Sequence, residues 1–305
     1  MEGISGGGGL SGDPWPVAEE GRQSEAAPRR RRFECPGPPP KRAQAIPTAS
    51  SIRSGGAWIS PPRHVADNIN RGHWLIGVDI ETHDWDDARG RQGSIGRFGH
   101  YSLCSEQDLQ ARVVQLGWAI GPIADWSSAV MKERIITPMN FVISDKASRF
   151  HGITHDQATE CGSCLGKVLE EFMSDALQAV QEHDARLVCH HLEFDAAIIA
   201  NEFLRCGLPH LEARWAGLAR GGICTMDPEI GRWLRSCRGN DTGSTTAKHC
   251  LSLKETIAQL SPESSNLLLP AKHQSAGADA VLHGLIAVTL RAYAYAPSTV
   301  GPEGH

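Results

Sequence analysis

The sequence predicts an α/β fold in which helices cover both faces of a mixed β-sheet. Two observations lead to this prediction. Short apolar runs typical of buried strands occupy the first part of the folded region. Amphipathic segments then alternate with further apolar runs, so that three strands are followed by helix, strand, helix, strand and helices, an order that fits a mixed sheet.

The predicted strands are apolar runs of ordinary strand length. They are residues 74–80 (WLIGVDI), 113–120 (VVQLGWAI), 134–136 (RII), 186–189 (RLVC) and 222–226 (GICTM). The first three follow one another without a helix, which suggests an antiparallel meander. The polar, Gly-rich stretch 83–110 is longer than a hairpin connection, so we expect it to be an insertion.

The predicted helices show apolar residues at three- and four-residue spacing. Residues 165–180 are the clearest case, with an apolar stripe running from Leu165 to Val180. The other predicted helices are residues 194–204, 251–260 and 278–294.

Residues 1–55 are predicted to form a disordered tail, and residues 56–305 the folded domain. The tail is rich in Gly, Pro and Arg and offers few apolar residues for a core. Its run Arg29–Arg32 and the later pair Lys41–Arg42 resemble a bipartite nuclear-localisation signal, and the same charges also fit a solvated tail.

Composition indicates an intracellular protein with no membrane segment. No apolar run approaches the roughly 18 residues that a membrane span needs. The first residues lack the layout of a secretory signal, and nine scattered cysteines fit a reducing compartment better than a disulfide framework. Residues after the tail hold 22 Lys or Arg against 29 Asp or Glu, and this acidic balance argues against a broad phosphate-binding surface.

Four acidic residues stand at the edges of apolar elements. Asp79 and Glu81 end the first strand two positions apart, so both side chains project to one side. Asp195 and Asp279 lie near the starts of two predicted helices, where an acid can also serve simply to interact with the helix dipole. Together the four carboxylates suit two hard cations about 3.5–4 Å apart.

Four segments resemble the motifs of DnaQ-like (DEDDh) 3′→5′ exonucleases, in the family's order and over roughly residues 74–295. They are GVDIET (77–82), FHGIT (150–154), VCHHLEFD (188–195) and HQSAGADA (273–280). The resemblance implies a ribonuclease H-like mixed sheet flanked by helices. This fold agrees with the order of strands and helices predicted above. It also implies hydrolysis of nucleic-acid ends with release of nucleoside 5′-monophosphates.

The resemblance also assigns roles residue by residue. It makes Asp79, Glu81, Asp195 and Asp279 the ligands of two Mg²⁺ or Mn²⁺ ions, with His273 as the general base. Thr82 matches a position that contacts the terminal nucleotide. The expected partner is the 3′ end of a single-stranded RNA or DNA, whereas the sequence identifies no protein partner.

Two departures from the family pattern leave a second interpretation open. Five residues separate His273 from Asp279, where the family usually has four, and we expect Gly277 to absorb the extra residue. His191 stands where the family usually has Asn. A catalytically inactive nucleic-acid-binding or scaffold domain of the same fold is therefore the alternative, and His283, four residues after Asp279, competes as the base or is simply packed within its helix.

The pair Cys161 and Cys164 has the spacing of a zinc or redox motif. A structural zinc site needs four ligands, and the sequence offers no second pair at a familiar distance. We therefore expect these two residues to be ordinary buried thiols.

Overall fold

The computed structural model describes residues 67, 72–84, 111–237, 250–260 and 275–295. All of them belong to one compact unit, Cys35–His305. The predicted tail at 1–55, most of the predicted insertion at 83–110, and His273 lie outside the described residues, so these three stay predictions.

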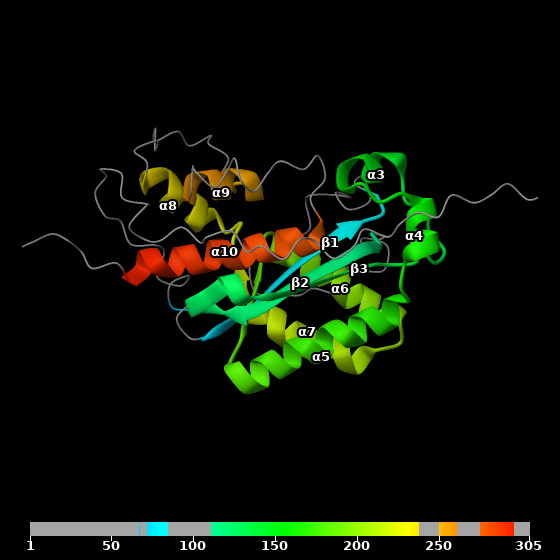
Figure 1. The fold of residues 1–305 in the computed structure, drawn as a ribbon, viewed down its shortest axis with the longest axis horizontal. Coiled ribbons are helices and arrows are strands. Elements are labelled where there is room, and N and C mark those ends of the chain that lie inside the picture. The colour runs from blue at the N-terminus through cyan, green and yellow to red at the C-terminus, as the bar shows by residue number, and fades with distance from the viewer. Residues whose placement is uncertain (1–66, 68–71, 85–110, 238–249, 261–274, 296–305) are drawn as a thin grey trace, which may run out of the picture. The chain divides into compact units, whose positions relative to one another are not determined.

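The sheet has five strands in the order β3-β2-β1-β4-β5 (Figure 1). β2 is antiparallel to β1 and β3, whereas β4 is parallel to β1 and β5 is parallel to β4. This order, with one reversed strand in the second position, is the ribonuclease H-like arrangement and confirms the predicted fold class. The strands are β1 (Trp74–Thr82), β2 (Val113–Pro122), β3 (Val130–Ile135), β4 (Arg186–Cys189) and β5 (Ile223–Cys224).

The described helices connect and cover these strands. A 3-10 helix, η2 (Ile123–Ser128), follows β2. The α-helices are α3 (Asp145–His151), α4 (His155–Cys161), α5 (Leu165–His183), α6 (Leu192–Arg205), α7 (Pro209–Arg220), α8 (Pro228–Cys237), α9 (Leu253–Leu260) and α10 (Ala276–Tyr295). None of these helices combines the length and the apolar composition that a membrane crossing requires.

Opposite faces of β1 contact different sets of helices, because successive strand residues point to opposite sides. Ile76, Val78 and Ile80 belong to the larger core, which α5, α6 and α7 complete. Leu75 belongs to a second core that includes α8, α9 and α10. Figure 1 shows α5 and α10 on opposite sides of the sheet.

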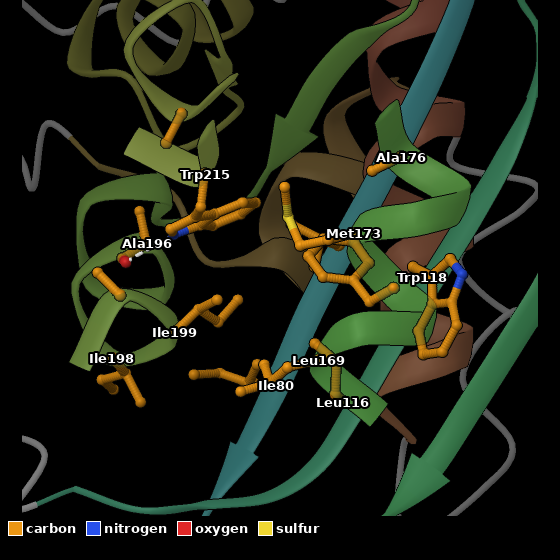
Figure 2. Packing of buried hydrophobic residues seen from close by; sticks show 14 of the residues in the cluster. Ile80, Leu116, Trp118, Leu169, Met173, Ala176, Ala196, Ile198, Ile199 and Trp215 are labelled. Atoms are coloured by element: carbon orange, nitrogen blue, oxygen red, sulfur yellow. Dashed lines mark hydrogen bonds between the residues drawn. The ribbon is translucent and has the colours of Figure 1, made fainter. Parts of the chain in front are cut away.

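Large aromatic side chains fill the core on the α5 side (Figure 2). The ring of Phe172 lies 5.6 Å from the ring of Trp118 and 5.6 Å from that of Trp215, measured between centroids. The indole N–H of Trp215 donates a hydrogen bond to the carbonyl of Ala196 at 2.9 Å. This packing fixes α6, the helix of Asp195, against the sheet.

The structure confirms most of the predicted elements and adds some that the apolar pattern did not indicate. The meander is present, although its third strand starts at Val130 rather than at 134. The short helices α3 and α4 were missed, yet their N-caps are polar: Ser144 and Thr154 each accept a hydrogen bond from a backbone N–H three residues on. α7 was also missed, and Pro209 at its first position is a typical start signal.

Candidate metal centre

β1 places Asp79 and Glu81 side by side on the face that α10 covers. Asp79 lies opposite Gly117 and Glu81 opposite Gln115 in the register with β2. The register shifts between Glu81 and Thr82, where regular pairing ends. Thr82 is half-buried at this end, and its hydroxyl donates to the carbonyl of Asp84 at 3.4 Å.

α10 lies directly on the backbone of β1 and β2 because both strands have a glycine beneath it. A Cβ at Gly77 would lie 2.0 Å from the carbonyl oxygen of Ala280, and one at Gly117 would lie 2.1 Å from the carbonyl carbon of Ala276. The side chain of Gln115 also accepts a hydrogen bond from the backbone N–H of Ala276 at 3.0 Å. These contacts fix the first turn of α10 over the acidic end of β1.

Three carboxylates meet as a result. Asp79, Glu81 and Asp279 each offer one oxygen, and these oxygens all lie within 4.8 Å of one another. One side-chain oxygen of Asp279, Oδ1, is buried without a hydrogen-bond partner. Oxygen ligands at this spacing are suited to hard divalent cations.

Asp195 joins the same electrostatic cluster from α6. Its side chain is buried, and its Oδ2 accepts a hydrogen bond from the thiol of Cys189, the last residue of β4. The residue before α6, His191, has a φ of 76°. This left-handed conformation favours Asn above most residues and tolerates His, so His191 fits the position at which the resembled motif has Asn.

Burial raises the pKa of each acid, and repulsion between the acids raises it further at Asp79, Glu81 and Asp195. Burial, followed by the charges of Asp195, Asp279 and Glu81, raises the pKa of Asp79 well above its usual range. Burial, then the charges of Asp279 and Asp195, raise the pKa of Glu81 to about 8. The pKa of Asp195 rises to about 8 through burial and that of Asp279 to about 7 for the same reason. The ionised form of these acids is therefore unfavourable in the metal-free protein, and bound cations would stabilise it.

Helix capping does not account for Asp195 or Asp279. The N-cap of α6 is His191, and the Asp195 carboxylate accepts its hydrogen bond from the Cys189 thiol. At α10 the hydroxyl of Ser275 accepts from the N–H of Ala278 at 3.3 Å, which makes Ser275 the capping side chain.

His283 is packed inside the protein, as one of the two interpretations anticipated. Its ring is buried, and Nδ1 lies 2.8 Å from the carbonyl oxygen of Val78, to which it donates. Nε2 lies 3.7 Å from Oδ1 of Asp79. Burial, aided by the nearby His190, lowers the pKa of His283 to about 3.

Two sequence-based expectations are wrong. Gly277 does not take up the extra residue before α10, because it is the second residue of that helix. It is also closely packed, since a Cβ there would lie 2.6 Å from Oε2 of Glu133. Any adjustment for the extra residue must therefore precede Ala276. Cys164 is exposed rather than buried, and Cys161 is half-buried. In the part of the chain that the structure describes, the acids, not these thiols, form the group that could hold a metal.

Sequence reasoning also missed residues that support the site. Gly77 and Gly117 were detectable as glycines inside strands, which often mark a close approach of another backbone. The role of Gln115 had no such signal, because its partner Ala276 is 161 positions away in the sequence. Cys189 lies only six positions before Asp195, but the apolar pattern does not show that its thiol donates to that carboxylate.

Comparison with known proteins places exonucleases among the similar solved structures. No protein-family model and no curated protein matches the sequence. Exonuclease I of E. coli in complex with a dT13 oligonucleotide aligns over 71% of this chain and 40% of its own, at 14% identity and a TM-score of 0.47. The apo form of exonuclease I aligns over 73% of this chain and 44% of its own, at 13% identity and a TM-score of 0.46.

A third similar structure is a 3′-exonuclease described with 3′-end-specific recognition of a histone mRNA stem-loop. It aligns over 71% of this chain and 80% of its own, at 13% identity and a TM-score of 0.42. The chain spans less than half the length of the exonuclease I chains that it matches. These similar structures are exonucleases, the class that the motifs resemble. The sheet order of this chain establishes its fold.

Proposed function

We propose that this chain is a metal-dependent 3′→5′ exonuclease of the DnaQ-like (DEDDh) type, releasing nucleoside 5′-monophosphates from nucleic-acid ends. One observation carries the proposal: oxygens of Asp79, Glu81 and Asp279 lie within 4.8 Å of one another. They come from a strand and from a helix some 200 residues later in the sequence. A cluster of half-buried like charges is unfavourable for a fold, and bound cations would compensate these charges.

The four acids would hold two Mg²⁺ or Mn²⁺ ions. The unpartnered Oδ1 of Asp279 and the raised pKa of every acid support this fit. Two such ions, when bound, favour attack by water on the terminal phosphodiester and stabilise the leaving oxygen. The proton of that water would pass to His273, because an imidazole is the side chain best suited to general-base catalysis near neutral pH.

The end of β1 would contact the terminal nucleotide through Thr82. Three exposed apolar side chains follow β3 in the sequence: Met139, Val142 and Phe150 are 62%, 69% and 58% exposed. The segment that carries them is bonded to the end of β1, because the N–H of Ser144 donates to the carbonyl of His83 at 2.9 Å. Exposed apolar groups suit unpaired bases better than phosphates, which supports a single-stranded end as substrate.

Digestion of single-stranded RNA and DNA labelled at the 5′ end tests the proposal. With Mg²⁺ or Mn²⁺ we expect a ladder of products shortened from the 3′ end, and with EDTA we expect none. Cleavage that persists undiminished in EDTA would refute the metal mechanism. Binding of metal and single strands without any cleavage would establish the alternative, an inactive scaffold of the same fold.

A further inference from the structure

A buried ion pair joins α6, the helix that carries Asp195, to Arg112, the residue before β2. Glu202, on α6, has no exposed side-chain surface, and its Oε1 accepts from Nε of Arg112 at 2.9 Å and from the backbone N–H of Val113 at 3.0 Å. Its Oε2 lies 3.4 Å from Arg205. A buried carboxylate with this many partners is expensive to disturb, because removing one partner leaves charge uncompensated.

Glu202 lies on the same side of α6 as Asp195. They are seven positions apart, and at about 100° per residue a step of seven returns to within about 20° of the starting direction. Asp195 is bonded to Cys189 on β4, and Glu202 is bonded to Val113 on β2. Because β1 lies between β4 and β2, α6 is held on both sides of the strand that carries Asp79 and Glu81.

Arg112, the partner of Glu202, also contacts the end of β1. Its backbone N–H donates to Nδ1 of His83 at 3.1 Å, and its backbone carbonyl accepts from the N–H of His83 at 3.1 Å. Its guanidinium donates to the carbonyl of Met139 at 3.3 Å and lies 4.8 Å from the centre of the Phe141 ring. One arginine thus contacts α6, the end of β1 and the loop before α3.

We infer that Glu202, through Arg112, is a positioning residue that sets the place of Asp195 relative to Asp79 and Glu81. The inference rests on the proposed function, since it gives the junction a role in cation binding. Glu202 touches none of the three acids, so its effect passes through the backbone of α6 and the end of β1. Residues that hydrogen-bond metal ligands directly typically change metal affinity by about 10–100-fold when substituted, and we expect this indirect contact to act at the lower end of that range.

The test measures Mn²⁺ binding to the full chain by calorimetry, together with kcat, KM and thermal stability. Glu202→Gln retains an oxygen for the Val113 N–H but loses the charge. Arg112→Lys retains a charge but loses the planar fork. We expect each to weaken Mn²⁺ binding about tenfold or more and to lower kcat more than KM, with folding retained.

Glu171→Gln is the matched control. Glu171 accepts two bonds from Arg134, at 2.8 and 3.1 Å, in a pair that joins α5 to β3 and is about one-third exposed. Its loss should leave Mn²⁺ affinity unchanged. If Glu202→Gln and Arg112→Lys bind Mn²⁺ as the wild type does, whatever their thermal stability, the positioning role is overturned. Failure of the proposed function gives a different result, since the wild-type chain itself would then fail to bind Mn²⁺ or to cut.

Discussion

A side chain at Gly77 would collide with the backbone of Ala280, because a Cβ there would lie 2.0 Å from that carbonyl oxygen. Because Gly77 has no side chain, α10 can pack this closely on β1. Asp279 precedes Ala280 by one residue, so the same contact sets the distance from Asp279 to Asp79.

Gly77→Ala should separate α10 from β1 and disperse the acids. We expect a loss of stability of at least about 2 kcal/mol, as is usual for overpacking, and a loss of Mn²⁺ binding. Gly217→Ala is the control, since a Cβ at this position in α7 would meet nothing within 4 Å. That change should stabilise the protein by about 0.5–1 kcal/mol. Urea unfolding and calorimetry measure both, and intact Mn²⁺ binding in Gly77→Ala would contradict the packing argument.

Substitution of single acids should abolish cleavage without unfolding the chain. Asp79→Asn and Asp279→Asn should each reduce kcat by about a thousandfold or more, since several kcal/mol of transition-state stabilisation depend on the cations. Circular dichroism should stay unchanged, because a like charge has been removed from a cluster. The exposed Glu160→Gln should cut as the wild type does. A variant with wild-type activity would remove that acid from the site.

The stability of the metal-free protein should fall as pH rises. The four acids have a raised pKa in the folded state, so the fold binds more protons than the unfolded chain between about pH 4 and 8. Their contribution is complete below about pH 4 and is lost as pH rises through about 7–8, at up to about 1.4 kcal/mol per pH unit for each group. Urea unfolding in EDTA at pH 5.5 and 8.5 measures this loss. Mn²⁺ should reverse it, and an equally large loss in Asp79→Asn would argue against the assignment.

The two histidines should differ in what their removal changes. His273→Ala should slow turnover by about 10²–10⁴-fold with Mn²⁺ binding retained, as expected for loss of a general base. His283→Ala should instead destabilise the fold by about 2–4 kcal/mol, because the ring is buried between α10 and β1. Single-turnover rates and urea unfolding separate the two effects. If the outcomes are exchanged, His283 is the base.

Phe150→Ala should weaken the binding of single strands. Stacking on one base is worth about 1–3 kcal/mol, so KM should rise by about tenfold while kcat changes little. Val130→Ala is a suitable control, because Val130 is 64% exposed but pairs with Ile120 near the end of β2. Thr82 pairs with Val113, at the opposite end of that strand. An equal effect of both substitutions would exclude a specific role for Phe150.

The sequence by itself determined the order of the main elements and nominated Asp79, Glu81, Asp195 and Asp279. Both results depend on local information. Apolar periodicity reports which side of a strand or helix is buried, and two acids two apart on a strand must share a side. The short helices α3 and α4 could have been predicted from their capping residues Ser144 and Thr154, since capping is local as well.

Only the tertiary structure decided which of these acids meet and what holds them. An acid near the start of a helix is equally compatible with an interaction with the helix dipole and with a metal site. The neighbours decide between the two: Ser275 caps α10, and the Cys189 thiol donates to Asp195. The contact of Gln115 with Ala276 and the ion pair of Glu202 with Arg112 join residues 161 and 90 positions apart. Pairings at such separations depend on how the helices pack against the sheet, and one sequence, read locally, contains no signal that selects them.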